Sequence, residues 1–136
     1  MDLTKAMLVS AAGMRAQGTR LKVIAENVAN ADSTAETPGD LPYRRKVVTF
    51  KNEMDRSLGI STVKVEKVGV DRSDFQRRYD PTHPSADADG YVLLPNVNSI
   101  IETMDMREAQ RSYEANMAVI EAARSMLSKT VELIRS

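Results

Sequence analysis

The sequence predicts an α+β fold, in which N- and C-terminal α-helices form a coiled-coil-like helical part around a small β-rich insert. Apolar residues recur at a period of about 3.5 residues near both ends of the chain. All five prolines, four of the six glycines and the β-branched runs lie instead between Asn30 and Asn96. We therefore expect a discontinuous helical domain, residues 1–30 plus 97–136, and an insert with loops over residues 31–96.

The first predicted helix carries a narrow stripe whose members are separated by alternating steps of four and three residues. The stripe consists of Leu3, Met7, Ser10, Met14, Gln17, Leu21, Ile24 and Val28. Such spacing is typical of a coiled-coil seam rather than of a broad core face. The apolar members are therefore candidate subunit-packing residues, and Asp2 or Thr4 is expected to cap the start of the helix.

The stretch ENVANADST, residues 26–34, is expected to end this helix. Asn27, Asn30 and Asp32 are residue types that tolerate left-handed geometry and bond to freed backbone groups. We expect them to stop the helix at a defined length and to turn the chain into the insert.

The insert has the composition of short strands joined by turns. Strands are predicted over residues 46–50, 61–70, 75–79 and 91–94, because these segments are rich in β-branched and aromatic residues or alternate in polarity. Pro38-Gly39 and Leu41-Pro42 mark a turn-rich connection. The strand pairing does not follow from the sequence.

The last predicted helix, residues 97–134, carries two stripes and is suited to two partners. The first stripe contains the candidate subunit-packing residues Met106, Tyr113, Met117, Ile120, Leu127, Val131 and Ile134, together with Gln110 and Arg124. The second contains Val119, Ala123, Met126, Thr130 and Leu133. Gln110 and Arg124 are expected to find carboxylate or backbone partners, because a buried unpaired charge is costly.

The two helices differ in predicted length. At 1.5 Å per residue the first is about 37 Å long and the last about 55 Å. If they pair, five apolar side chains of the longer helix have no cover within the chain: Met126, Leu127, Val131, Leu133 and Ile134. Other chains are expected to cover them. The alternative is that a longer first helix or a folded-back insert does so, and each candidate packing residue has the parallel alternative of filling the chain's own core.

No group of residues predicts catalysis, a cofactor or a metal site. His83, the single histidine, lies between two prolines and is expected to be a turn residue. The run 85–90 lacks the glutamate of a calcium loop and is better interpreted as a polar turn entering a strand. The basic clusters Arg44-Arg45-Lys46 and Arg77-Arg78 are expected on a solvated sheet face or against acidic groups of a neighbouring chain.

The overall charge and the N-terminus exclude several classes of partner. Nineteen basic side chains balance nineteen acidic ones, so no net field attracts nucleic acid or an anionic membrane. The chain has no cysteine, the first 20 residues lack the apolar core of a Sec-type signal, and no run reaches the roughly 18 apolar residues of a membrane span. The residues alone therefore predict a non-enzymatic, self-associating or partner-binding module, with a small enzyme or metal-binding domain as a weaker alternative.

Three segments resemble the bacterial flagellar axial protein family and, within it, proximal rod proteins of the FlgC type. They are ENVANADST, residues 42–50 and the block from His83 to Thr130, and the resemblance covers nearly the whole chain. The residues that carry the motifs are Asn27, Asn30, Ala31, Gly90, Tyr91, Pro95, Asn96, Val97, Asn98, Tyr113 and Asn116.

The resemblance implies a structural subunit of the flagellar rod, the periplasmic drive shaft that transmits torque from motor to hook. It implies assembly with further copies and other rod proteins, and contact with the membrane-ring or export-gate junction and with the distal rod. It also implies passage through the flagellar type III export apparatus without a cleaved signal, and neither a cofactor nor a direct membrane span. The remaining alternative is a soluble coiled-coil adaptor or export chaperone.

Overall fold

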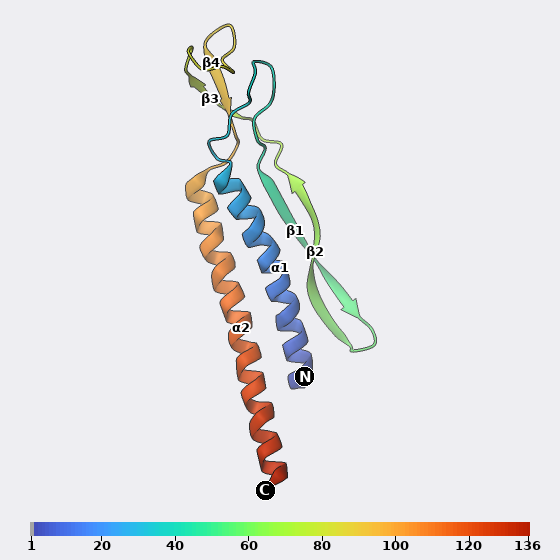
Figure 1. The fold of residues 1–136 in the computed structure, drawn as a ribbon. Helices are drawn as coiled ribbons and strands as arrows, with labels where there is room; N and C mark the ends of the chain where they lie inside the picture. Colours follow the sequence, from blue (N-terminus) through green and yellow to red (C-terminus); the bar gives the residue numbers. More distant parts are fainter. Residues whose placement is uncertain (1) are drawn as a thin grey trace. The chain divides into compact units, whose positions relative to one another are not determined.

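The computed structural model describes residues 2–136 and has a helix at each end with four strands between them (Figure 1). In chain order the elements are α1 (Leu3–Ala29), β1 (Lys46–Asp55), β2 (Ile60–Val70), β3 (Gln76–Tyr79), β4 (Tyr91–Leu94) and α2 (Ser99–Arg135). This order confirms the predicted α+β class. No helix within the described residues combines the length and the apolar character needed to cross a bilayer.

Both helices begin at side-chain caps. Oδ1 of Asp2 accepts the backbone N–H of Lys5 at 2.7 Å, which makes Asp2 the N-cap of α1. Oδ1 of Asn98 accepts the backbone N–H of Ile100 at 3.0 Å. This second cap places the start of α2 at Ser99, two residues later than the sequence predicts. From there α2 continues for 37 residues without glycine or proline, which explains its uninterrupted length.

The strands form two separate two-stranded sheets, β1 with β2 and β3 with β4. The β1–β2 turn is held by Asp55, whose Oδ1 accepts the N–H of Ser57 at 2.9 Å, and it closes with Gly59 at φ +66°. The hydrogen bonds from Ser57 lower the pKa of Asp55. β3 and β4 are antiparallel, with Tyr79 opposite Tyr91. β1 extends beyond the predicted 46–50. The sequence does not mark its outer half as a strand, because these residues are exposed and, apart from Met54, polar, so they show no apolar alternation.

The chain divides into two compact units that both draw on the terminal helices. The first unit is Met1–Leu21, Val48–Lys67 and Arg107–Ser136; the second is Lys22–Val47 and Val68–Met106. The predicted division into a helical domain and an insert groups the residues differently and stays a prediction.

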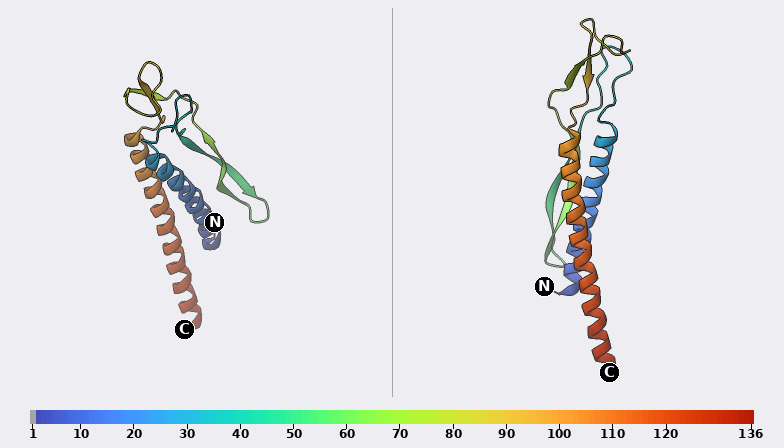
Figure 2. Two further views of the ribbon diagram at one scale, coloured as in Figure 1. Left: turned by 45° about the horizontal axis from the view of Figure 1, so that its top comes forward. Right: turned by 90° about the vertical axis from the view of Figure 1, so that its left-hand side faces the viewer.

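Within the first unit, α1 and α2 approach each other closely at Gly13, and small residues are buried on both helices. Ala12, Ala16 and Ala123 are buried. A Cβ atom added at Gly13 would lie 2.7 Å from Nδ2 of Asn116 on α2, so the two helix backbones approach each other at this glycine. In Figures 1 and 2 the C-terminal part of α2 continues beyond the N-terminal end of α1.

Candidate functional site

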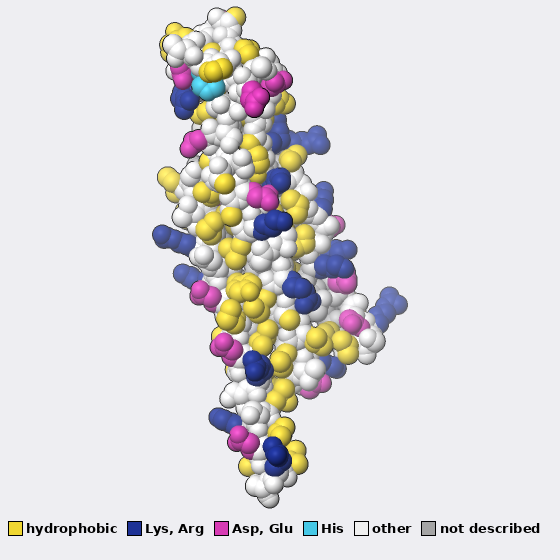
Figure 3. Space-filling view, in the orientation of Figure 1, with side chains coloured by type: hydrophobic (Ala, Val, Ile, Leu, Met, Phe, Trp, Pro, Cys, Tyr) yellow, Lys and Arg dark blue, Asp and Glu magenta, His cyan; other side chains and the backbone are white. Residues whose placement is uncertain are grey.

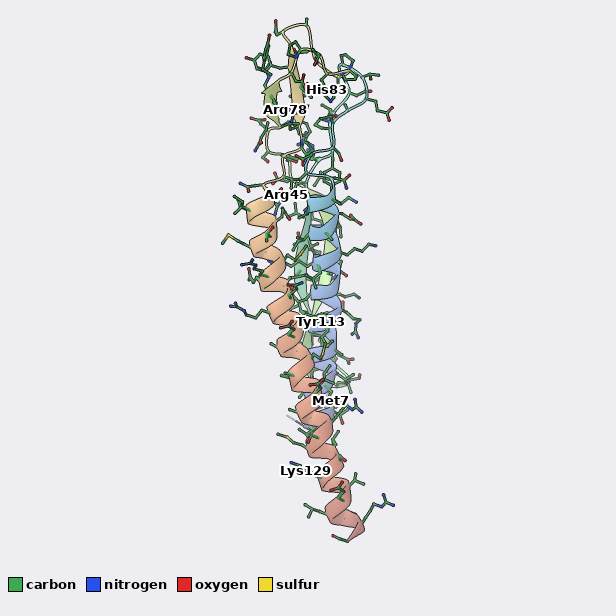
Figure 4. All side chains as sticks on the ribbon, turned by 60° about the vertical axis from the view of Figure 1, so that its left-hand side comes forward. Met7, Arg45, Arg78, His83, Tyr113 and Lys129 are labelled. Carbon is green, nitrogen blue, oxygen red and sulfur yellow. The ribbon has the colours of Figure 1, made fainter. Side chains whose placement is uncertain are left out.

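A cluster of polar side chains, here called the polar junction, connects the end of α1, the start of β1 and the start of α2 within the second unit. Its members are Asn27, Tyr43, Arg45, Asp71, Asn96 and Glu102. Figure 4 shows Arg45 beside the first turns of α2. Two of the members, Asn27 and Glu102, are each only 1% exposed, so their polar atoms depend on partners within the protein.

Asn27 joins the last turn of α1 to the first residue of β1. Its Oδ1 accepts the N–H of Lys46 at 2.9 Å, and its Nδ2 donates to the carbonyl of Lys46 at 2.9 Å. The side-chain amide thus binds this residue as a neighbouring strand would. Nδ2 also donates to Oε2 of Glu102 at 3.3 Å, and the hydroxyl of Tyr43 donates to Oδ1 at 2.7 Å. All the hydrogen-bonding capacity of the amide is therefore used.

Arg45 neutralises the buried carboxylate of Glu102. Nε of Arg45 donates to Oε1 of Glu102, and the guanidinium also contacts Asp71 at 3.4 Å and Asp105 at 3.7 Å. Burial disfavours the charged guanidinium, but the hydrogen bonds and charges of Glu102 and Asp71 outweigh burial and raise the pKa of Arg45. The basic cluster 44–46 therefore finds partners inside its own chain, which corrects the expectation of a solvated sheet face.

Asp71 is held ionised by its local turn. The backbone N–H of Ser73 donates to Oδ1 of Asp71 at 2.8 Å, and the hydrogen bonds from Ser73 lower the pKa of Asp71, with Arg45 adding to the effect. Burial of Tyr43 raises the pKa of its hydroxyl, so this group remains a protonated donor to Asn27. The junction thus combines the guanidinium of Arg45 with two carboxylates and with neutral donors.

The segment PNVN, residues 95–98, attaches α2 to the junction. Oδ1 of Asn96 accepts the N–H of Arg45 at 2.7 Å, and its Nδ2 donates to the carbonyl of Asp71 at 2.9 Å. Pro95 and Val97 are buried beside it, while Asn98 caps the helix. Each of the four motif residues therefore has a structural role. Pro95 and Val97 are packed in the interior, Asn96 joins two loops, and Asn98 caps the start of α2.

Of the predicted mechanism for ending α1, the left-handed geometry is wrong and the local side-chain bonding is present. No residue other than glycine within the described chain has positive φ, so Asn27, Asn30 and Asp32 are not left-handed. Nδ2 of Asn30 donates to the carbonyl of Glu26 at 2.9 Å, as a second hydrogen bond beside the backbone N–H of Asn30 at 3.1 Å. Asn27 lies inside the helix and serves the junction.

The β3–β4 region explains the glycine and tyrosine of the second motif. Gly90 has φ +85°, and an added Cβ would lie 2.9 Å from the ring of Tyr79, so only glycine fits. The rings of Tyr79 and Tyr91 meet edge to face with centroids 5.4 Å apart. Arg77 lies over the Tyr91 ring, 4.4 Å from its centroid. Arg77 thus covers an aromatic ring and also lies 3.6 Å from Asp87.

His83 lies in a turn, as the sequence predicts. Its Nδ1 accepts the backbone N–H of Ser85 at 3.0 Å, and its Nε2 lies 3.2 Å from Oγ1 of Thr34. In the run 85–90, Oδ1 of Asp87 accepts the N–H of Tyr91 at 2.9 Å, as in a polar turn entering a strand. Among residues 2–136 no group of three or more His, Cys, Asp or Glu side chains is arranged to hold a metal ion.

The candidate packing residues of α1 lie mostly beside its interior face. Ile24 is buried, Val28 is exposed, and Leu3, Met7, Met14 and Leu21 are half-buried. The interior face itself uses small residues such as Ala12 and Ala16. The role of these positions between subunits stays a prediction.

The candidate packing residues of α2 become more exposed toward the C-terminus. Met106, Tyr113 and Ile120 are half-buried, whereas Met117, Leu127, Val131 and Ile134 are exposed. Exposure reaches 55% at Met126, 77% at Leu133 and 79% at Ile134. Neither the insert nor a longer first helix covers these side chains in the described chain, and hydrophobic side chains interspersed with charged ones are visible at this end in Figure 3. Gln110 and Arg124 are exposed as well.

Sequence reasoning missed the ion pair of the polar junction. Arg45 and Glu102 are 57 residues apart in the chain, and neither a charge cluster nor a helical glutamate identifies its partner. The sequence contained one indication of a buried partner. Glu102 lies seven residues before Ala109, on the same face of the predicted helix, where an apolar residue is expected.

Comparison with known proteins gives a consistent result over the whole chain. A family model described as "Flagella basal body rod protein" matches residues 7–35, and one described as "Flagellar basal body rod FlgEFG protein C-terminal" matches residues 88–133. These segments contain most of α1 and most of α2, and they include Asn27, Asn96 and Glu102 of the polar junction.

Curated relatives match at nearly full length. The flagellar basal-body rod protein FlgC of Agrobacterium fabrum is 50% identical over 134 residues, which are 98% of this chain and 96% of that protein. FlgC of Bacillus subtilis is 39% identical, over 92% of this chain and 93% of that protein. FlgC of Salmonella typhimurium is 38% identical, over 92% of each.

Proposed function

This chain belongs to the family of flagellar basal-body rod proteins of the FlgC type, and we propose that its terminal helices join it to neighbouring rod subunits. As a member of that family it is a structural subunit of the flagellar rod and belongs to the flagellar basal body. Its relatives are structural rod proteins rather than enzymes. They do not favour a cytoplasmic adaptor or export chaperone.

The observation that carries the proposal is the uncovered apolar surface at the C-terminal end of α2. It is formed by Met126, Leu127, Val131, Leu133 and Ile134, which are between 37% and 79% exposed. Complete burial of such a side chain stabilises a protein by about 1.5–3 kcal/mol, as an upper estimate. Covering all five is thus comparable to the stability of a whole domain, and neighbouring rod subunits are the natural source of that cover.

The mechanical role follows from many such contacts repeated along a helix of subunits. A head-to-tail contact that does not close generates an open helical assembly. Torque would pass through many parallel helix contacts, and stiffness would come from their number. We place this shaft in the periplasm, between the membrane-ring or export-gate junction and the distal rod, with the chain delivered by the flagellar type III export apparatus without a cleaved signal.

The proposal is tested by charging the uncovered surface. The double variant Leu133→Glu and Ile134→Glu changes only exposed side chains, so the isolated chain should keep its unfolding midpoint. Its cells should be non-motile, and their purified basal bodies should lack a complete rod. The matched control, Glu132→Gln with Arg135→Gln, alters exposed polar residues of the same helix and should assemble normally. Normal motility of the Leu133/Ile134 variant at wild-type expression would contradict the proposal.

A further inference from the structure

Two glycines of α1 have different surroundings, and only one is explained by the chain itself. Gly13 is buried against Asn116, whose Nδ2 leaves no room for a Cβ atom. At Gly18 an added Cβ would meet no atom of the described chain within 4 Å, and the backbone is not left-handed. Glycine inside a helix lowers helix stability relative to alanine. Nothing within residues 2–136 therefore accounts for glycine at position 18.

Gly18 belongs to a regular uncharged stripe on α1, here called the outer seam. The outer seam consists of Met7, Ala11, Met14, Gly18 and Leu21. Its large members and its small members each recur every seven residues, and all five residues are half-buried. Alternating large and small residues at this spacing form the knobs and holes of a closely packed helix pair. Small residues allow helix backbones to approach closely, as Gly13 does toward α2.

α2 carries a matching stripe on a face distinct from its contact with α1. This face, here called the second seam, consists of Ala115, Val119, Ala122, Met126 and Leu133. All five are exposed, with Val119 at 45% and Met126 at 55%. Ala123 and Asn116, by contrast, lie on the face turned toward α1. From Ala115 to Met126 the second seam thus has the same spacing and the same alternation of small and large residues as the outer seam, and Lys129 takes the place of the next small residue before Leu133. None of its five members is covered within the described chain.

We propose that the second seam of α2 from one copy of this chain packs against the outer seam of α1 from a second copy, with the backbones closest at Gly18. The large side chains of each seam then fill the space beside the small residues of the other. A second copy is the favoured occupant because the complementary stripe is present in this same chain. The inference rests on the proposed function and specifies both the partner and the surface for one of its helix contacts.

The contact uses two different surfaces of the molecule. A copy bound through its second seam still offers its outer seam to the next copy, so the interaction is heterologous and open-ended. This property suits growth of a rod. In the isolated chain Gly18 lowers the stability of α1, and in the assembly it allows the two helices to pack closely. Replacing Gly18 by alanine should therefore stabilise the isolated chain and weaken the assembly.

The first experiment compares Gly18→Ala with Gly13→Ala in the full chain. In the isolated protein Gly18→Ala should raise the unfolding midpoint by roughly 3 °C, because alanine favours the helix and meets no obstacle. In cells it should reduce the number of complete rods by roughly tenfold, because the added methyl separates the seams. Gly13→Ala should lower the midpoint. Wild-type rod numbers with Gly18→Ala would overturn the proposal.

The second experiment identifies the occupant by disulfide cross-linking, which is clean because the chain has no cysteine. Cells producing both Met14→Cys and Ala122→Cys copies should yield, after mild oxidation of purified basal bodies, a disulfide-linked product with the mass of two copies. The matched control replaces Met14→Cys with Arg15→Cys, an exposed neighbour outside the outer seam, and should yield little. Cells producing either cysteine variant alone should yield much less of this product. If the two variants together yield no more of it than the controls, a second copy does not occupy the seam, and the proposal is overturned.

The two proposals fail in different ways. If Leu133→Glu with Ile134→Glu blocks assembly while Gly18→Ala assembles normally and no cross-link forms, only the seam contact is wrong. If both variants assemble normally, the role of the terminal helices in assembly is wrong as well.

Discussion

The polar junction and the C-terminal end of α2 differ in where their partners lie. In the junction, charged and amide groups such as Asn27 and Glu102 are almost fully buried, and their hydrogen bonds are made within the chain. At the end of α2, apolar side chains such as Leu133 and Ile134 are largely exposed. The polar groups of the junction are thus buried, whereas the apolar side chains at the end of α2 are exposed to solvent. The difference separates a region whose groups are satisfied within the chain from one whose cover we propose to come from other subunits.

The largest effect on the isolated chain is expected from Arg45→Met. The substitution leaves the carboxylate of Glu102 buried without its cation, which typically costs about 3–5 kcal/mol. Because Arg45 retains 22% side-chain exposure, we expect the lower end, about 3 kcal/mol, in the free energy of unfolding measured with urea. Pairing the change with Glu102→Gln removes the unpaired charge and should recover part of the loss. An equal loss with and without the second change would mean that packing, not charge, holds the junction.

A smaller loss is expected from Asn27→Ala. The alanine variant removes the side-chain bonds to the backbone of Lys46 and leaves that N–H and carbonyl to find other partners, at a cost of about 2 kcal/mol. Asn30→Ala, which removes only a bond to a terminal carbonyl of α1, should cost less than about 1 kcal/mol. If Asn30→Ala were the more damaging change, ending the helix would matter more than joining it to β1.

The sequence predicts the helices well because their evidence is local. The stripe from Leu3 to Val28 and the long run after Asn98 follow from periodicity and capping alone. The polar junction does not, because the pairing of Arg45 with Glu102 depends on how β1 and α2 are brought together, and many alternative partners have the same charge. Asn27 shows the limit clearly: its residue type suggested a helix end, whereas its bonds to Lys46 make it a buried connector.

The same limit applies to the packing residues. A period of about 3.5 residues identifies a helix face that seeks a partner, but it does not say whether the partner is in the same chain. Ile24 turned out to be buried in the single chain and Ile134 exposed. Gly13, which lies against Asn116 of α2, is outside the predicted stripe because glycine contributes no hydrophobic side chain.

Acid is expected to weaken the junction by a small amount through Asp71. The lowered pKa of Asp71 means that its contribution to stability is present above its unfolded value of about 3.9 and is lost as the pH falls through the folded pKa. The side chain is partly exposed, so we expect about 0.5 kcal/mol or less. Urea unfolding at pH 6 and pH 3 should show a smaller loss in Asp71→Asn than in the wild type. Identical losses would remove Asp71 from the acid response.

The smallest expected change in stability, and the most direct test of the comparison, concerns the end of α2. Leu133→Ser should alter the free energy of unfolding of the isolated chain by less than about 0.5 kcal/mol, because the side chain is already exposed. Amide hydrogen exchange of the isolated chain should accordingly be fast over residues 127–134 and slower over 102–109 by roughly two orders of magnitude, since a helix without tertiary contacts is marginal in water. In assembled rods the difference should disappear. Uniform protection in a dilute monomer would mean that the end of α2 is stable by itself, and the argument that assembly completes this region would fail even if the junction behaved as expected.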